Sequence, residues 1–155
     1  MLQTKPLTSF CKAFCLAILL STTLSATDIY DSIFVEAGKK YNVHPMLLKK
    51  IATIESGLNP KAICKNTNNT SDYGLMQINT IHFKRLKQYG ISEANIMNPK
   101  VNIYVGSWIL SETIKRNGFN FDAIGNYHSA TPKYKEIWLS KLIKELKKEY
   151  KNSNS

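Results

Sequence analysis

The chain has 155 residues, a length that predicts a single domain. Hydrophobic residues make up 43% and charged residues 21%, which is the composition of an ordinary globular protein and excludes a disordered tail, a collagen and a disulfide mini-protein. The formal charge of +10 indicates a protein that contacts an anionic partner. The candidates are nucleic acid, anionic lipid and anionic cell-wall polymer.

Residues 1–26 have the pattern of a secretory signal peptide. Lys5 and Lys12 give a positive start, residues 13–20 form an unbroken apolar run, and small and polar residues follow. The apolar run is shorter than the ~20 residues that a membrane-spanning helix needs. We therefore expect an exported protein with no stable membrane span after processing, and an uncleaved N-terminal anchor is the alternative.

Removal of residues 1–26 would leave Cys64 as the single cysteine, so no intrachain disulfide could form. We expect Cys64 to be a small buried apolar side chain, with an intermolecular disulfide as the alternative. His44, His82 and His128 are scattered and have no accompanying cysteine or carboxylate cluster, so we expect no metal site.

The rest of the chain is mostly helical in its apolar spacing. In chain order, the spacing together with Pro and Gly signals predicts helices over 28–41, 45–56 and 78–89, one turn at 92–96, and helices over 99–117, 121–127 and 132–150. Residues 58–73 are rich in Asn and read as an ordered loop that could hold a short hairpin, and residues 151–155 read as a tail.

Glu55 is the first candidate for chemistry. It shares a helical stripe with Leu48 and Ala52, so its carboxylate is expected to project from the apolar side of the helix. Burial and the negative end of the helix dipole should both favour the protonated form, which could donate a proton to a leaving oxygen. The alternative is a helix-end Glu that turns into solvent.

Two further segments suit the recognition of a polar ligand. In residues 74–79, Gly74 permits close backbone approach, and Gln77 and Asn79 offer amide donors and acceptors between apolar residues. In residues 125–129, the hydroxyl of Tyr127 stands beside small polar residues. Each segment also has an ordinary interpretation, because the first could be a turn that enters a helix and the second could place its tyrosine in the core.

Taken together, these segments resemble the ordered motifs of lysozyme-like lytic transglycosylases. The motifs are Glu55-Ser56-Gly57-Leu58-Asn59-Pro60, Gly74-Leu75-Met76-Gln77-Ile78-Asn79, Asn98-Pro99 with Asn102-Ile103 and Gly106, and Tyr127-His128-Ser129. Each is short, but their order and spacing across residues 30–138 are specific. The chain is most similar to the small exported type that accompanies secretion, conjugation or pilus machines, with residues 27–150 as its catalytic domain.

The resemblance implies an all-α (α+β lysozyme-like) fold, a single helical domain with a small loop or hairpin beside the active-site cleft. It implies that Glu55 is the catalytic acid, that no cofactor is needed, and that the protein works in the bacterial periplasm or cell envelope. Peptidoglycan glycan strands would be the substrate, and the implied substrate-binding residues are Ser56, Gly74, Met76, Gln77, Asn79 and Tyr127. One departure is visible, because many relatives have Asn where His128 stands and Gly where Ala130 stands.

Asp72 leaves a second enzyme open. The stretch from Ser71 to Asn79 also resembles animal-type lysozymes, in which the corresponding Asp is a second carboxylate that works together with the catalytic acid. Asp72 could therefore support hydrolysis as a muramidase, or it could be a turn residue that caps its own backbone. A non-catalytic peptidoglycan-binding module is an alternative of another class, although it would not need Glu55. No nucleic-acid partner is expected, since no nucleic-acid motif occurs.

Overall fold

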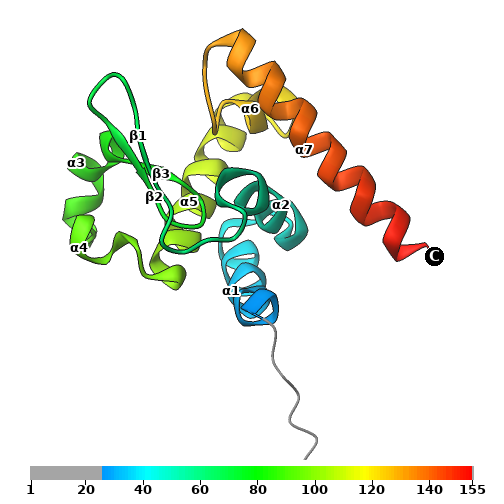
Figure 1. Ribbon diagram of the computed structural model, residues 1–155, viewed down its shortest axis with the longest axis horizontal. Helices are drawn as coiled ribbons and strands as arrows, with labels where there is room; N and C mark the ends of the chain where they lie inside the picture. Colours follow the sequence, from blue (N-terminus) through cyan, green and yellow to red (C-terminus); the bar gives the residue numbers. More distant parts are fainter. Residues whose placement is uncertain (1–25, 155) are drawn as a thin grey trace, which may run out of the picture.

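The structure is a computed structural model that describes residues 26–154 (Figure 1). In chain order, its elements are α1 (Ala26–Tyr41), α2 (Pro45–Ser56), β1 (Ile63–Lys65), β2 (Ser71–Tyr73), β3 (Ile78–Asn79), η1 (Thr80–His82), α3 (Phe83–Leu86), η2 (Lys87–Tyr89), α4 (Glu93–Ile96), α5 (Pro99–Asn117), α6 (Phe121–Gly125) and α7 (Pro132–Ser153). The predicted signal peptide lies outside the described residues, apart from Ala26. Within residues 26–154, no helix is long and apolar enough to cross a membrane.

The predicted helices over 28–41, 45–56, 99–117 and 132–150 are confirmed to within a few residues, and the helical fold with a small hairpin is confirmed with them. The single helix predicted over 78–89 is wrong. Ile78 instead pairs with Tyr73 as part of a strand, and the Asn79 side chain caps the next turn by accepting a hydrogen bond from the Ile81 amide at 3.0 Å. The predicted helix over 121–127 ends at Gly125, and the predicted tail is helical as far as Ser153.

The three short strands form one antiparallel sheet in the order β1-β2-β3. In β1–β2, Cys64 lies opposite Asp72, and in β2–β3, Asp72 lies opposite Asn79. All three residues of β1 are exposed, because β1 is an edge strand with no layer packed on it. The expectation of a buried Cys64 is therefore wrong, since its thiol stands on this exposed edge.

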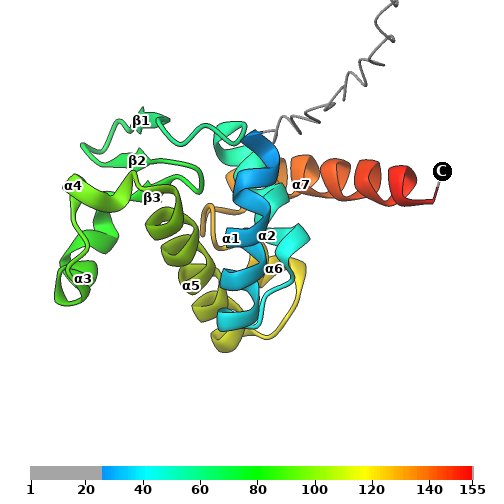
Figure 2. The ribbon, with the colours of Figure 1, turned by 90° about the horizontal axis from the view of Figure 1, so that it is seen from below.

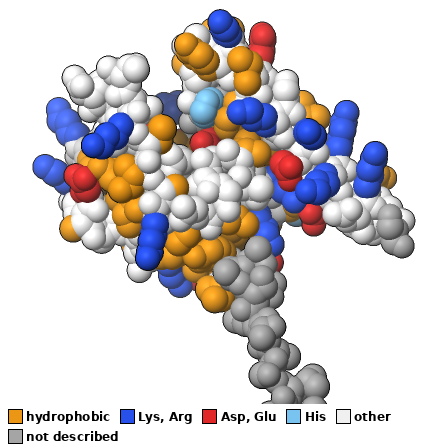
Figure 3. All heavy atoms as spheres, viewed as in Figure 1, with side chains coloured by type: hydrophobic (Ala, Val, Ile, Leu, Met, Phe, Trp, Pro, Cys, Tyr) orange, Lys and Arg blue, Asp and Glu red, His pale blue; other side chains and the backbone are white. Residues whose placement is uncertain are grey.

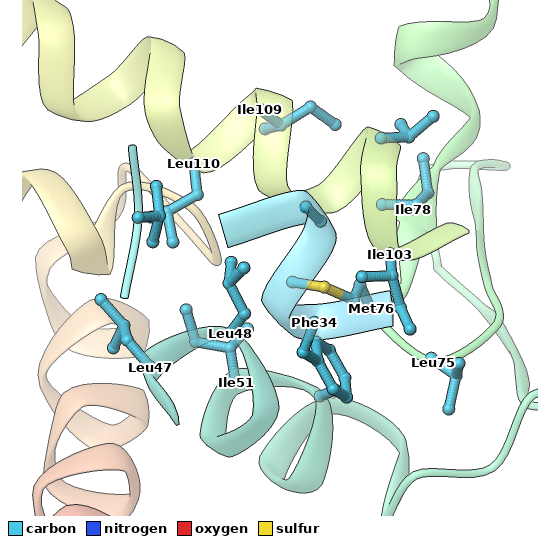
Figure 4. Packing of buried hydrophobic residues seen from close by; sticks show 14 of the residues in the cluster. Phe34, Leu47, Leu48, Ile51, Leu75, Met76, Ile78, Ile103, Ile109 and Leu110 are labelled. Atoms are coloured by element: carbon cyan, nitrogen blue, oxygen red, sulfur yellow. The ribbon is translucent and has the colours of Figure 1, made fainter. Parts of the chain in front are cut away.

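The core is one cluster that joins both parts of the molecule. Helix α5 lies between the lobe of strands and short helices and the pair α1 and α2 (Figure 2). Met76, in the loop before β3, packs into the cluster beside Phe34 and Ile103 (Figure 4). Gly106 makes this contact possible, because a Cβ on Gly106 would stand 2.8 Å from the Met76 side chain. The sheet is thus fixed to the helices through buried side chains.

Helix α7 closes the other side of the molecule. It packs against α2 and α6 and buries Trp138 and Leu142 on its inner face. Near its end, Lys50 of α2 and Glu149 form an ion pair at 2.8 Å, while the last turns extend past the body (Figure 1). Helix α7 is therefore packed against the core through one face, while its remaining face is charged.

Candidate active site

The local sequence of α2 decides where Glu55 stands. The imidazole of His44 caps the helix start by accepting a hydrogen bond from the Met46 amide, and Pro45 occupies the first turn. Gly57 ends the helix with a left-handed φ of 63°, a conformation that favours glycine. Because Glu55 lies in the last turn, its carboxylate emerges at the edge of the core, where its side chain is only 10% exposed.

One oxygen of the Glu55 carboxylate is held by two aromatic residues. The indole Nε1–H of Trp138 donates to Oε1 at 2.8 Å, and Trp138 itself is 4% exposed. The Nδ1 atom of His128 lies 3.3 Å from the same oxygen, and the imidazole stacks on the Trp138 ring at 5.5 Å between centroids and 9° between planes. Neither contact engages Oε2. The carboxyl group therefore has a fixed orientation and one oxygen that these residues leave open.

Tyr127 stands beside this group. Its hydroxyl donates to the backbone carbonyl of Met76 at 2.7 Å, and its ring lies 6.4 Å from that of Trp138. Burial raises the pKa of Tyr127 well above its usual value, and the negative charges of Glu55 and Asp72 raise it further. The phenol is therefore neutral across the physiological range, and both carboxylates lie near enough to act on it.

The side chain of Asn102, on α5, fixes the segment 74–79 in place. This fully buried side chain accepts from the Met76 amide at 2.7 Å and donates to the carbonyls of Tyr73 at 2.8 Å and Ile96 at 3.1 Å. Gly74 has a φ of +74°, and a Cβ there would meet the Asn102 amide nitrogen at 2.4 Å. Glycine is therefore required by both backbone conformation and space.

The polar residues of these motifs mostly hold the loop in place. The Ser56 hydroxyl donates to the carbonyl of Leu75 at 2.8 Å, which joins the end of α2 to the loop. The Gln77 amide donates to the carbonyl of Gly74 at 2.9 Å and to that of Ala62 at 3.4 Å. The Met76 side chain is fully buried, so only its backbone could take part in a binding surface.

Asp72 lies in β2 rather than in a turn, so the interpretation as a turn residue that caps its own backbone is wrong. The Asn79 amide donates to Oδ1 at 2.7 Å and the Asn66 amide donates to Oδ2 at 2.8 Å. Cross-strand pairing explains the first contact, because directly opposed residues share one face of the sheet. Asp72 is therefore a carboxylate whose two oxygens are each positioned by an amide.

The structure brings Glu55, Tyr127, His128 and the segment 74–79 together, with Asp72 near Tyr127. The space-filling view shows a hollow between the lobe of the β1–β2 hairpin and the start of α7, with one histidine and one carboxylate visible in it (Figure 3). Sequence reasoning missed Trp138, because a tryptophan within the apolar stripe of an amphipathic helix looks like any core residue. In the described part of the chain, no group of three His, Cys, Asp or Glu residues could hold a metal ion.

Comparisons with known proteins agree with this architecture. The Transglycosylase SLT domain family matches residues 32–153. Invasion protein IagB of Salmonella typhi is 38% identical over 146 residues, which cover 87% of this chain and 91% of IagB. Protein IpgF of Shigella flexneri is 38% identical over 115 residues, which cover 73% of each chain. The Peptidoglycan-binding-like protein of Escherichia coli O157:H7 is 36% identical over 132 residues, covering 80% of this chain and 77% of that protein.

A solved structure shows the same fold. An inactive mutant of the lytic transglycosylase Slt from Pseudomonas aeruginosa superposes with a TM-score of 0.56 and 19% identity, covering 77% of this chain and 21% of Slt. The chain therefore belongs to the Transglycosylase SLT domain family. Within that family it is a peptidoglycan lytic transglycosylase, a class that acts outside the cytoplasm because its substrate lies there.

Proposed function

We propose that this enzyme cleaves the β-1,4 bond between N-acetylmuramic acid and N-acetylglucosamine, with Glu55 as its catalytic acid. The observation that carries this assignment is the nearly buried carboxyl group whose Oε1 accepts the Trp138 indole hydrogen. Because Oε1 accepts the Trp138 hydrogen bond, Oε2 is the oxygen that carries the transferable proton in this proposal. Glu55 donates that proton to the glycosidic oxygen while the bond from this oxygen to the muramic acid C1 breaks.

The second half of the reaction uses the same residue. The Glu55 carboxylate removes the proton from the O6 hydroxyl of the muramic acid, and O6 bonds to C1 to close a 1,6-anhydro ring. The proton thus returns to Glu55, and no water is consumed. The positive charge that develops near C1 is met by the negative carboxylate, and the neutral phenol of Tyr127 adds no charge to the site.

The predicted substrate-binding residues have two kinds of role in this proposal. Gln77, Asn79 and the backbone at Gly74 form the wall of the cleft, and Ser56 and the buried Met76 hold that wall against α2 and the core. Tyr127 joins the wall to the acid through its hydrogen bond to the carbonyl of Met76. Because these contacts fasten the loop to α2 and to the segment after α6, the cleft is formed before substrate arrives.

The direct test is Glu55→Gln, assayed by the release of soluble muropeptides from purified peptidoglycan. The amide keeps the shape and the ability to accept the Trp138 hydrogen bond but has no transferable proton, so release should fall to background. Glu136→Gln on the exposed face of α7 is the matched control and should retain full activity. Near-normal release by a folded Glu55→Gln variant would show that Glu55 is not the acid.

A muramidase that hydrolyses the same bond is the second candidate, and the position of Asp72 is the observation that supports it. Both Asp72 oxygens are fixed by the amides of Asn66 and Asn79, and its charge reaches the Tyr127 hydroxyl near Glu55. A true second carboxylate would make Asp72→Asn severe, with a loss of about 10²-fold or more in rate and reducing ends on the products. We favour the transglycosylase, for which Asp72→Asn should be a modest change through cleft shape.

We also propose that residues 1–26 direct export to the periplasm or cell envelope, that residues 27–150 are the catalytic domain, and that the enzyme opens the wall locally for a secretion or conjugation apparatus. The apolar run at 13–20 supports the first point, and the name of the relative IagB as an invasion protein supports the last. Cell fractionation tests export. A shortened chain should occur in the periplasmic fraction, and soluble full-length protein in the cytoplasm would contradict the proposal.

A further inference from the structure

A groove of about 460 Å³ lies between the end of α1, η2 and the first half of α5. That volume is within the range of about 300–1,000 Å³ that is usual for ligand pockets. We name it the α1/α5 groove, and four aromatic residues and two lysines define it: Tyr41, Tyr89, Tyr104, Trp108, Lys40 and Lys100. Tyr89 is 63% exposed, and its ring meets that of Trp108 edge to face at 5.9 Å.

The groove is separate from the catalytic cleft. On α5, Asn102 and Gly106 face the loop of residues 74–79, as their contacts with Met76 show. Tyr104 lies two residues after Asn102, and Trp108 lies two residues after Gly106. Two residues correspond to a rotation of about 200° around an α-helix, so Tyr104 and Trp108 lie on the opposite side of α5. An occupant of the groove would therefore leave Glu55 and the glycan site open.

Cations surround the aromatic rings of the groove. Lys40 Nζ stands 5.5 Å and 5.3 Å from the ring centroids of Tyr41 and Tyr104, and the Arg85 guanidinium is 3.9 Å from that of Trp108. Lys100 is already paired, since it bonds to Glu36 at 2.7 Å. Lys40 and Arg85 make no carboxylate contact that would neutralise them in the described structure, so they form a basic rim on an apolar groove.

We propose that the α1/α5 groove binds an acidic segment of a partner protein, with an apolar or aromatic side chain of that segment in the groove and flanking carboxylates at Lys40 and Arg85. Charge complementarity favours an acidic occupant. The mostly apolar lining favours the apolar side chain of a peptide over a neutral sugar, because the many hydroxyls of a sugar would find few polar partners in this lining. The proposal does not depend on the assignment of Glu55, because it concerns binding at another face.

The two tryptophans of the chain make the test direct, because one stands in the groove and the other contacts Glu55. In ¹⁵N-labelled protein, the indole signals of Trp108 and Trp138 report on the two sites separately, and Trp108→Phe assigns them. The probe is a short synthetic peptide of Asp and Glu around one central Leu-Trp pair. The matched peptides carry Ala-Ala at the centre, or Lys in place of each acidic residue.

The acidic Leu-Trp peptide should shift the Trp108 signal and leave the Trp138 signal in place. The double variant Lys40→Glu/Arg85→Glu should weaken binding about tenfold or more, and Tyr89→Ala should also weaken it, while each stays folded because these side chains are exposed. The double control Lys141→Glu/Lys144→Glu on α7 changes charge equally and should bind as the wild type does. Binding should weaken as salt is raised, because exposed charges are screened.

Other results would overturn the proposal. An unshifted Trp108 signal at millimolar peptide would show that the groove is not such a site. Equal binding of the Ala-Ala peptide, or equal loss in the α7 control, would reduce the effect to general charge attraction. A Trp108 shift caused by muropeptides instead would make the groove a second glycan site, and a shift that depends on protein concentration alone would make it a contact between two copies.

Discussion

The hydrogen bond from Trp138 to Glu55 yields the sharpest prediction about the active site. Trp138→Phe keeps an aromatic ring under His128 but removes the indole donor to Oε1. A hydrogen bond to a charged group contributes about 1.5–3 kcal/mol. If this bond acts in the transition state, where Glu55 becomes a carboxylate, its loss should lower kcat roughly 10- to 150-fold. KM should change little, because the indole is buried beneath the acid and does not reach the glycan.

The assay is the rate of soluble muropeptide release at saturating peptidoglycan, with thermal unfolding measured in parallel. Loss of ring volume at a buried site should also lower stability by about 1–3 kcal/mol, so rates are compared well below the midpoint of unfolding. Trp108→Phe is the same substitution on the far side of α5 and should leave kcat within about twofold. Wild-type turnover by folded Trp138→Phe, or an equal loss in Trp108→Phe, would refute this role for the indole.

Three further substitutions separate the roles of neighbouring groups. His128→Asn should lower kcat only about two- to fivefold, because its 3.3 Å contact with Glu55 is longer than that of Trp138 and the imidazole is 38% exposed. A loss of kcat as large as that of Trp138→Phe would mean that His128 is also needed to orient the Glu55 carboxyl group. Tyr127→Phe should lower the rate about tenfold in a folded chain, and an unchanged rate with a lower midpoint of unfolding would make Tyr127 a purely structural residue. Asn102→Leu should lower the free energy of unfolding, measured in urea, by about 2–4 kcal/mol, because three buried backbone groups lose their hydrogen-bond partner. A decrease below about 1 kcal/mol would contradict this role for Asn102.

Much of the helical framework follows from local sequence. Pro45 and Gly57 bound α2, and Pro99 and Gly118 bound α5, because proline suits a first turn and glycine adopts the conformations that end a helix. Helical spacing on α2 also placed Glu55 at the edge of the core. These predictions succeeded because each depends on contacts within a few residues of chain.

The main differences from the predictions depend on distant partners. Residues 78–89 have helical spacing, but pairing with β2 converts Ile78 and Asn79 into a strand. Cys64 is exposed because β1 is an edge strand, which a single sequence does not reveal. Trp138 lies 83 positions from Glu55, and only the packing of α7 on α2 brings its indole to the carboxylate. The candidate acid was therefore predictable, while the group that orients it was not.

The mass of the muropeptides released from purified peptidoglycan tests the central claim most directly. If Glu55 acts alone on the glycosidic bond and then on O6, the products end in 1,6-anhydro-muramic acid, weigh one water less than hydrolysis products and have no reducing end. Products that are dominated by reducing muropeptides would contradict the account and assign the enzyme to hydrolysis with Asp72 as its second carboxylate.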